Sequence, residues 1–172
     1  EVSDDQALTN SIRVMKETGA DAVKLEGAKL SQIRALVSSG IPVMGHVGFT
    51  PQSVNTLAGY KVQGRSEQDA ARILQECKDI EAAGAFAVVL EMIPAELAQE
   101  ISQKLAIPTI GIGAGADCDG QILVWQDFAG LGTRSPKFAK QYLNLRQDLS
   151  AAATAFRNEV VAGEFPAPEQ QF

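Results

Sequence analysis

The chain has 172 residues, of which 45% are hydrophobic and 21% charged, a composition typical of a folded globular domain with its own core. Its formal net charge is −6 and its lysines and arginines form no basic stripe, which argues against a nucleic-acid partner. No apolar run approaches the ~20 residues of a membrane span, and no basic, apolar leader opens the chain. We therefore expect a cytoplasmic protein without a membrane partner.

The numbers of cysteines and histidines limit the disulfide bonds and metal sites that the chain can form. The two cysteines, Cys77 and Cys118, are too few for a disulfide framework, which fits a reducing cytoplasm, and Cys77 falls on the apolar stripe of an expected helix. His46 is the one histidine, so a histidine-rich metal site is excluded. The chain begins at Glu1 rather than at a methionine and is expected to be helical almost at once, which suggests a piece of a longer protein.

The first half of the chain alternates helix and strand. A helix is expected between Ser3, a plausible N-cap, and Gly19, at the place of a C-terminal cap. A strand over residues 22–26, a helix over 30–38 and a strand over 41–46 follow. The next connection, residues 47–65, is longer than the ~2–6 residues usual between strand and helix, which indicates a working loop.

The second half continues the alternation. Ser66 and Asp69 resemble a capping box at the start of an amphipathic helix that runs to Gly84. The remaining expected elements are a strand over 87–91, a helix from Pro94 to about 105, strands over 107–112 and 121–125, a helical section from 135, and a final helix stopped by Gly163 and Pro166. Short apolar strands alternating with helices predict an α/β fold with a parallel sheet.

An internal repeat points to a barrel. Residues 19–26 align with 84–91, and residues 41–45 align with 107–111 at nearly the same offset, as expected for related parts of a (β/α)8 TIM barrel. About five strands are expected, whereas a complete barrel has eight. The chain is therefore expected to hold about strands four to eight, with residues 1–134 as a partial barrel and 135–172 as a helical extension of the same domain.

Four polar residues are placed at strand ends. Lys24 and Glu26 are two residues apart, so they share one face of their strand, and Glu91 occupies the equivalent place in the repeat. His46 ends the next expected strand. The carboxyl ends of barrel strands carry the active sites of barrel enzymes, and buried charges need a partner or a metal. A purely structural Lys24–Glu26 pair and a structural histidine are the alternatives. Whether Tyr60, Lys61 and Arg65 in the long connection bind an anion or are simply solvated stays open.

Several strings of the sequence together resemble one enzyme family. In chain order they are residues 23–27 (VKLEG), 45–53 (GHVGFTPQS), 59–65 (GYKVQGR), 89–91 (VLE), 110–115 (IGIGAG), 119–124 (DGQILV) and 136–140 (PKFAK). In this order they resemble the C-terminal two-thirds of the ketopantoate hydroxymethyltransferases, and the resemblance extends to about Gly163.

The resemblance implies a reaction. This family transfers a hydroxymethyl group from 5,10-methylenetetrahydrofolate to 3-methyl-2-oxobutanoate, giving 2-dehydropantoate for pantothenate biosynthesis through a magnesium-stabilised enolate. By resemblance, Glu26 is a Mg²⁺ ligand, Lys24 contacts the 2-oxo acid, His46 is a substrate-side hydrogen-bonding group and Glu91 is the catalytic base. The family's other two metal-binding carboxylates lie on earlier strands, which are absent here, so activity of this chain alone is in doubt.

Two other readings compete with this one. A magnesium-dependent barrel enzyme of the phosphoenolpyruvate mutase and isocitrate lyase type is disfavoured. Such enzymes usually need a cysteine or another acid on a flexible lid, and Cys118 lies outside the long connection of residues 47–65. The second is an inactive fragment kept as an assembly partner.

The apolar stripe of the last helix, formed by Leu149, Ala152, Phe156 and Val160, must be covered either by its own barrel or by another subunit. The resemblance implies a homo-oligomer, commonly a decamer.

Overall fold

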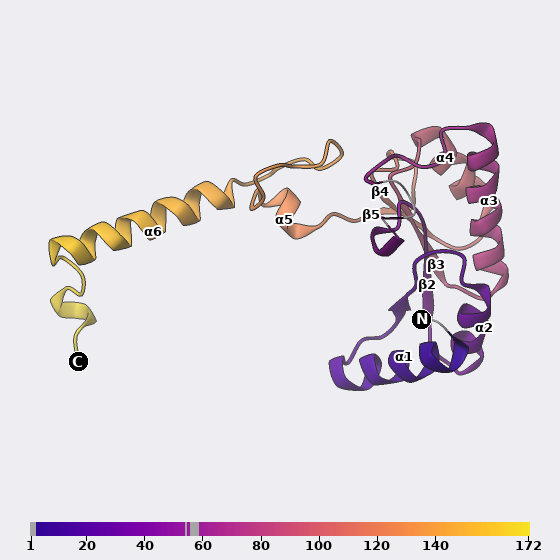
Figure 1. The fold of residues 1–172 in the computed structure, drawn as a ribbon, viewed down its shortest axis with the longest axis horizontal. Coiled ribbons are helices and arrows are strands. Elements are labelled where there is room, and N and C mark those ends of the chain that lie inside the picture. Colours follow the sequence, from indigo (N-terminus) through magenta and orange to yellow (C-terminus); the bar gives the residue numbers. More distant parts are fainter. Residues whose placement is uncertain (1–2, 54, 56–58) are drawn as a thin grey trace. The chain divides into compact units, whose positions relative to one another are not determined.

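The computed structural model describes residues 3–53, 55 and 59–172, and the chain divides into two compact units, residues 1–122 and 123–172. The first unit is built on a five-stranded parallel sheet in which each strand pairs with the next along the chain (Figure 1). Its strands are β1 (Val23–Lys24), β2 (Val43–Gly48), β3 (Ala87–Glu91), β4 (Thr109–Ile112) and β5 (Gly120–Gln121). This is the expected α/β architecture, part of a (β/α) barrel.

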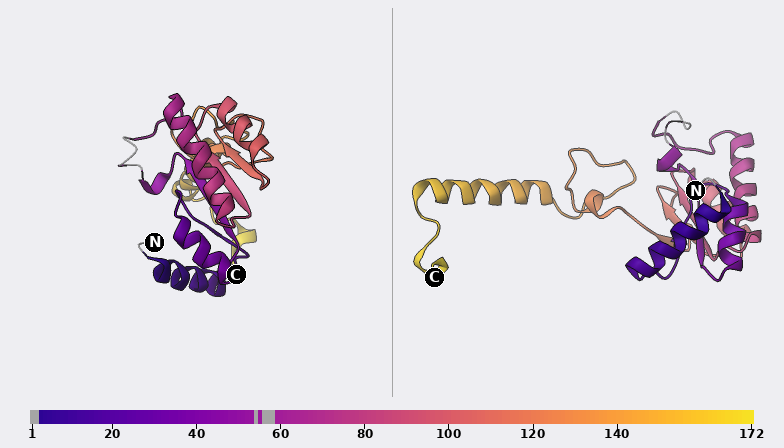
Figure 2. Two further views of the ribbon diagram at one scale, coloured as in Figure 1. Left: turned by 90° about the vertical axis from the view of Figure 1, so that its right-hand side faces the viewer. Right: turned by 60° about the horizontal axis from the view of Figure 1, so that its bottom comes forward.

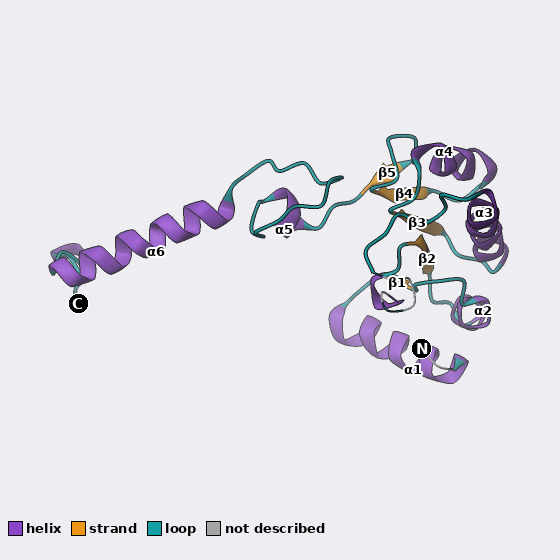
Figure 3. Ribbon diagram, turned by 45° about the horizontal axis from the view of Figure 1, so that its top comes forward, coloured by secondary structure: helices purple, strands orange, loops and turns teal. Residues whose placement is uncertain are grey.

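The first helix of this unit precedes β1, and each of the other three lies between two strands in sequence. They are α1 (Asp4–Thr18), α2 (Leu30–Ser38), α3 (Glu67–Ala82) and α4 (Ala95–Lys104), with a short 3-10 helix η1 (Pro51–Ser53) after β2. Helices α2, α3 and α4 lie along the same side of the strands (Figure 3), and α3 crosses in front of the sheet when that side faces the viewer (Figure 2, left). Parallel strands joined in sequence by right-handed crossovers place their helices on one face in this way.

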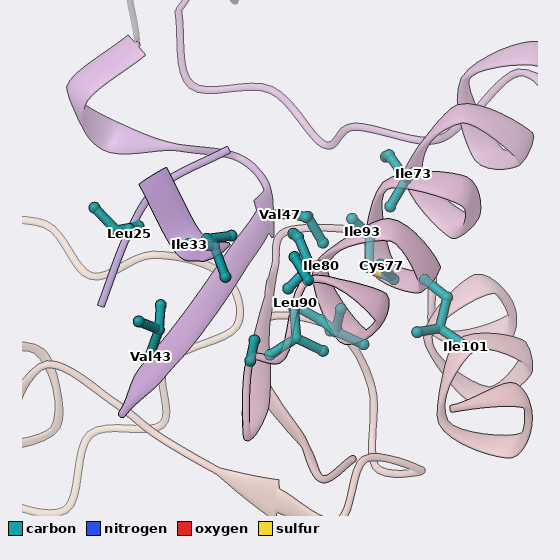
Figure 4. Packing of buried hydrophobic residues seen from close by; sticks show 14 of the residues in the cluster. Leu25, Ile33, Val43, Val47, Ile73, Cys77, Ile80, Leu90, Ile93 and Ile101 are labelled. Atoms are coloured by element: carbon teal, nitrogen blue, oxygen red, sulfur yellow. The ribbon is translucent and has the colours of Figure 1, made fainter. Parts of the chain in front are cut away.

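The hydrophobic core fills the space between the sheet and these helices. Val47 and Leu90 of the strands lie next to Ile80 of α3, and Val43 lies on the side of Leu25 and Ile33 (Figure 4); all of these side chains are almost completely buried. Leu25 belongs to this core and Val23 packs against it, as expected from strand alternation. The next residues in each strand, including Lys24, His46 and Glu91, therefore face the other side of the sheet.

Local sequence signals explain most of the helix ends. The Ser3 hydroxyl accepts a hydrogen bond from the Gln6 amide at 3.2 Å, and Gly19 adopts the left-handed conformation at the other end of α1. Ser66 caps α3 by accepting from the Asp69 amide at 3.2 Å. A capping box also requires the Asp69 carboxylate to accept from the Ser66 amide, and this part of the expectation is wrong. The carboxylate accepts instead from the Gly64 amide at 2.5 Å and from the Arg72 guanidinium.

Two strands differ in extent from the expectation. β2 begins at Val43 and continues to Gly48, so His46 lies two residues before its end rather than at it. The ladder with β3 pairs Val47 with Leu90 and Gly48 with Glu91, which carries the strand past His46. β1 is shorter than expected, but its backbone continues to bond to β2 as far as the Gly27 amide, which donates to the His46 carbonyl at 2.8 Å.

The expected strand over 121–125 is wrong in its second half. The ladder ends with the Ile122 amide donating to the Gly111 carbonyl at 3.0 Å. Beyond it, Trp125 begins a helix, α5 (Trp125–Phe128), whose last turn is closed by the Ala129 amide donating to the Trp125 carbonyl at 2.9 Å.

The second unit holds α5, α6 (Leu145–Ala162) and a 3-10 helix, η2 (Pro168–Gln170). The helical section expected from residue 135 is wrong, because no helix precedes Leu145 there. The Tyr142 amide donates instead to the Phe128 carbonyl at 2.8 Å, and the Leu145 amide to the Ala129 carbonyl at 2.9 Å. Gly163 ends α6 in the left-handed conformation, as expected. The domain boundary expected after residue 134 stays a prediction.

Both cysteines are free thiols. Cys77 is fully buried in the core, and burial raises the pKa of its thiol to about 12, which agrees with its expected role as a small apolar side chain. Among the described residues, no helix is both long and apolar enough to cross a membrane.

Candidate active site at the carboxyl ends of β1, β2 and β3

The strand register brings the four expected site residues to one edge of the sheet. Lys24 pairs with Met44, and the bond from the Gly27 amide to the His46 carbonyl continues that register, so Glu26 lies beside His46. Two residues further along β2, Gly48 pairs with Glu91. All four side chains arise from the face of the sheet opposite the helices, near the carboxyl ends of the strands, where barrel enzymes hold their active sites.

Lys24, Glu26 and His46 form one cluster. The Lys24 ammonium nitrogen lies 3.1 Å from His46 Nδ1 and 3.8 Å from a Glu26 carboxylate oxygen, and the same oxygen lies 4.0 Å from Nδ1. A protonated lysine has only donors, so Nδ1 must accept. We therefore assign the neutral histidine the tautomer with its proton on Nε2, on the basis of this network.

Nε2 of His46 faces Glu91 across the β2–β3 ladder. It lies 3.0 Å from a Glu91 carboxylate oxygen, close enough for an ion pair or a hydrogen bond. The buried Nε2 nevertheless has no well-directed hydrogen-bond partner among the described residues. The two observations agree if the carboxylate oxygen lies off the axis of the ring N–H, so that the contact is close but poorly aligned.

The cluster is largely shielded from water and carries unbalanced charge. The side chains of His46, Glu26 and Glu91 are 3%, 10% and 14% exposed, whereas Lys24 is 42% exposed. One ammonium and two carboxylates leave a net negative charge when the histidine is neutral. Because buried charge is costly unless it is compensated, a cation or a positively polarised ligand fits this site.

The carboxylate oxygens of Glu26 are the type of ligand that Mg²⁺ prefers, but one glutamate supplies too few protein ligands for a complete site. One oxygen faces Lys24 and His46, and the other accepts from the Gln52 backbone amide at 3.0 Å. Mg²⁺ prefers hard oxygen ligands and takes one or two carboxylates while keeping several waters. Within residues 3–53, 55 and 59–172, no group of three or more His, Cys, Asp or Glu residues is arranged to hold a metal. Glu26 can therefore contribute one ligand to a metal whose other protein ligands lie elsewhere.

The connection after β2 is attached to the site at three points. The short helix η1 begins at Pro51 and presents the Gln52 amide to Glu26. The Phe49 amide donates to the Glu91 carbonyl at 2.8 Å, and the Gln63 amide donates to the Met92 carbonyl at 2.9 Å. Sequence reasoning missed these backbone groups, because an amide N–H has no side-chain signature.

The three residues of the long connection that were considered for anion binding, Tyr60, Lys61 and Arg65, do not join the cluster. Tyr60 is 79% exposed, with its ring 5.0 Å from that of Phe49, and Lys61 and Arg65 are exposed. Residues 54 and 56–58 of this connection lie outside the described part of the chain.

Comparison with known proteins identifies the family of the chain. The sequence model of the ketopantoate hydroxymethyltransferase family matches residues 1–168. The chain belongs to the ketopantoate hydroxymethyltransferase family. Relatives named 3-methyl-2-oxobutanoate hydroxymethyltransferase include one from Thermobifida fusca, 57% identical over 98% of this chain, and one from Leifsonia xyli, 55% identical over 100% of it. The chain spans 61% and 63% of the length of these two relatives.

A solved structure supports the fold alone. 2,3-Dimethylmalate lyase, a member of the PEP mutase/isocitrate lyase superfamily, superposes with a TM-score of 0.50 at 15% identity, over 99% of this chain and 61% of its own. At this identity the similarity supports the barrel architecture and carries no information about the reaction.

Proposed function

We propose that the full-length protein containing this chain transfers a hydroxymethyl group from 5,10-methylenetetrahydrofolate to 3-methyl-2-oxobutanoate, giving 2-dehydropantoate for pantothenate biosynthesis. The observation that carries the proposal is the cluster of Lys24, Glu26, His46 and Glu91 at one barrel edge, in a member of this family. The proposal concerns the full-length protein, because the chain spans about three fifths of its relatives.

Glu91 is the proposed catalytic base. Its carboxylate takes the proton from C3 of the oxo acid. The electron pair left at C3 forms a bond to the methylene carbon of the folate, while the bond from that carbon to one folate nitrogen breaks and this nitrogen takes up a proton. Water then replaces the second folate nitrogen on the same carbon, which releases tetrahydrofolate and leaves the hydroxymethyl group. A positioned base of this kind contributes about 10²–10⁴-fold to the rate. The 3.0 Å approach of His46 Nε2 helps to hold the Glu91 carboxylate on the inner face of the sheet.

Lys24 and His46 are the proposed substrate-binding groups. The ammonium uses one of its three donors on His46 Nδ1, and at 42% exposure its remaining donors are accessible to the anionic end of the oxo acid. A fixed positive charge at this place stabilises the negative charge that develops on the substrate. His46 contacts both Lys24 and Glu91 and so lies between the group proposed to bind the oxo acid and the proposed base, although its Nε2 is itself buried.

Glu26 is the proposed Mg²⁺ ligand of this chain. When bound, Mg²⁺ supplies Lewis-acid stabilisation of charge on the carbonyl oxygen of the substrate. Glu26 is suited to hold it, because one carboxylate oxygen is fixed by the Gln52 amide and the other faces the cluster. The net negative charge of the cluster supports a cation here.

The second proposed property is homo-oligomeric assembly, with no nucleic-acid or membrane partner and a cytoplasmic location. Leu149, Phe156 and Val160 of α6 are each about half exposed, and α6 has no buried residue. An apolar stripe of this kind fits a subunit interface. The net charge of −6 supports the absence of a nucleic-acid partner, and the two free cysteines support a cytoplasmic location.

Exchange of the C3 hydrogen tests the proposed function directly. The full-length enzyme is incubated with Mg²⁺ and 3-methyl-2-oxobutanoate in D₂O without folate, and deuterium at C3 is followed by NMR; formation of 2-dehydropantoate is then assayed with folate. We expect Glu91→Gln to lower both rates at least about a hundredfold, in line with the loss of a general base. Glu17→Gln, an exposed glutamate paired with Arg13, is the matched control. Near-normal exchange in Glu91→Gln removes the assignment of the base.

A further inference from the structure

The turn that follows Glu91 is unusually constrained. Met92 is the one non-glycine residue with a positive φ, 48°, among the described residues, so the chain changes direction directly after the proposed base. On one side, the Met92 amide donates to the Ile112 carbonyl of β4 at 2.9 Å. On the other side, the Phe49 amide donates to the Glu91 carbonyl at 2.8 Å. The backbone of Glu91 is thus held between two neighbouring strands.

Gly48 is the residue that lets β2 approach this turn so closely. It pairs with Glu91 in the ladder and has a φ of +88°, a conformation that L side chains rarely adopt. A β-carbon at position 48 would overlap the carbonyl oxygen of Glu91, and it would lie 3.2 Å from the carbonyl carbon and 2.8 Å from Cγ2 of Ile93. Neither neighbour is the free end of a flexible side chain, because Ile93 is 2% exposed and belongs to the core.

We propose that Gly48 is a positioning residue for Glu91, because its missing side chain fixes the distance between β2 and the Glu91 backbone and so aims the Glu91 carboxylate at the substrate. This inference rests on the proposed role of Glu91 as the base. Any side chain at position 48 pushes the Glu91 backbone away from β2, while β4 and the buried Ile93 resist the movement. The Glu91 carboxylate then moves relative to His46, which lies on β2 two residues before Gly48. In the structure, Nε2 of His46 is 3.0 Å from a carboxylate oxygen of Glu91.

The kinetic consequence differs from that of a general loss of fold. A displacement of about 1 Å at a reacting group can cost about a hundredfold in rate. Binding of the oxo acid by Lys24 on β1 does not depend on the Gly48–Glu91 contact. We therefore expect Gly48→Ala in the full-length enzyme to lower kcat, and the rate of C3 exchange, about a hundredfold, and to leave KM for the oxo acid nearly unchanged.

Gly40 offers a matched control for backbone strain. It lies in the turn between α2 and β2 with a φ of +81°, close to that of Gly48, but a β-carbon there would meet no described atom within 4 Å. Gly40→Ala should therefore carry a similar conformational strain without moving Glu91. We expect it to lower the unfolding midpoint by less than Gly48→Ala, which adds steric overlap to the strain, while kcat stays near that of the parent enzyme.

A double-mutant cycle separates positioning from a merely structural role. If Gly48 acts through Glu91, adding Gly48→Ala to Glu91→Gln should lower kcat no further, because the group that Gly48 positions is already disabled. If the two losses multiply instead, Gly48 does not act through Glu91 and the inference is overturned. If Glu91→Gln itself retains exchange, the proposed function fails at its base, which is a separate outcome.

A second variant covers the case in which Gly48→Ala does not fold. Replacing Phe49 by its α-hydroxy analogue, phenyllactate, converts one amide to an ester, and so removes the N–H that bonds to the Glu91 carbonyl while keeping the buried ring. We expect a lower kcat with KM preserved. Unchanged kcat in this ester variant, or in a folded Gly48→Ala, overturns the inference.

Discussion

The ammonium nitrogen of Lys24 lies 3.1 Å from Nδ1 of His46, so this lysine contacts the histidine more closely than it contacts its sequence neighbour Glu26. The contact places the imidazole proton on Nε2, the ring nitrogen that lies 3.0 Å from Glu91, and so links the three strands of the site through side chains. Lys24 thus has two tasks in the proposed reaction, to orient His46 and to bind the anionic substrate.

Glu26 and Lys24 should be separable by their dependence on magnesium. We expect Glu26→Ala to abolish metal-dependent activity and to weaken binding of Mg²⁺, or of Mn²⁺ measured by EPR, because it removes an oxygen ligand. Lys24→Ala should mainly raise KM for the oxo acid, since a protonated lysine cannot ligate a metal. If the Glu26→Ala enzyme binds Mg²⁺ with unchanged affinity, Glu26 is not a ligand.

Asp69 should make stability depend on pH. Burial acts to raise the pKa of Asp69, but the Gly64 amide and the Arg72 guanidinium outweigh it, and the net pKa is lowered from 3.8. A lowered folded pKa adds stability at pH values above the unfolded pKa, and this stability is lost as pH falls through the folded pKa. We expect Asp69→Asn to reduce the free energy of unfolding of the full-length protein by about 1 kcal/mol at pH 7, with the difference shrinking below pH about 4.

Ser66→Ala is the matched control for this effect. It removes the cap of the same helix, at a cost of about 1 kcal/mol, but no titrating group. Its destabilisation should stay constant as the pH is lowered. If Asp69→Asn and Ser66→Ala show the same pH profile in denaturant titrations, the carboxylate of Asp69 is not the source of the dependence.

The stripe on α6 should matter for assembly. In the full-length protein, Phe156→Lys places a charge in the apolar stripe, whereas Asn158→Lys places the same charge on the opposite face of the helix. We expect the first to reduce the size of the oligomer in light scattering and the second to leave it unchanged. Truncation after Gln141 should have the stronger effect. The same oligomer with and without this tail would exclude α6 as an assembly element.

Alternation within strands was the most informative sequence signal for the site. The two-residue spacing of Lys24 and Glu26 predicted a shared face, and the repeat placed Glu91 at the same level two strands away. In the structure Lys24 lies 3.8 Å from Glu26, and Glu91 approaches them through His46, 3.0 Å away. Strand periodicity works here because one face of each strand must pack against helices, which leaves the other face for polar groups.

The sequence predicted the structure poorly where the outcome depends on backbone hydrogen bonds to segments far away in the chain. The apolar residues 122–125 fit a strand as well as a helix, and the absence of further ladder bonds after Ile122 decides the outcome. The Gln52 amide and the positive φ of Met92 likewise depend on how the chain crosses the ends of β1 and β4. Side-chain patterns cannot predict such backbone contacts.

The consecutive pairing of the strands also bears on how the chain folds. Because β1 pairs with β2, β2 with β3, and so on to β5, no strand has to wait for a partner that is synthesised much later. The sheet can grow by one strand and its covering helix at a time, in the order in which they leave the ribosome. The cluster of Lys24, Glu26, His46 and Glu91 can then form as soon as β3 docks, before β4 and β5 extend the sheet.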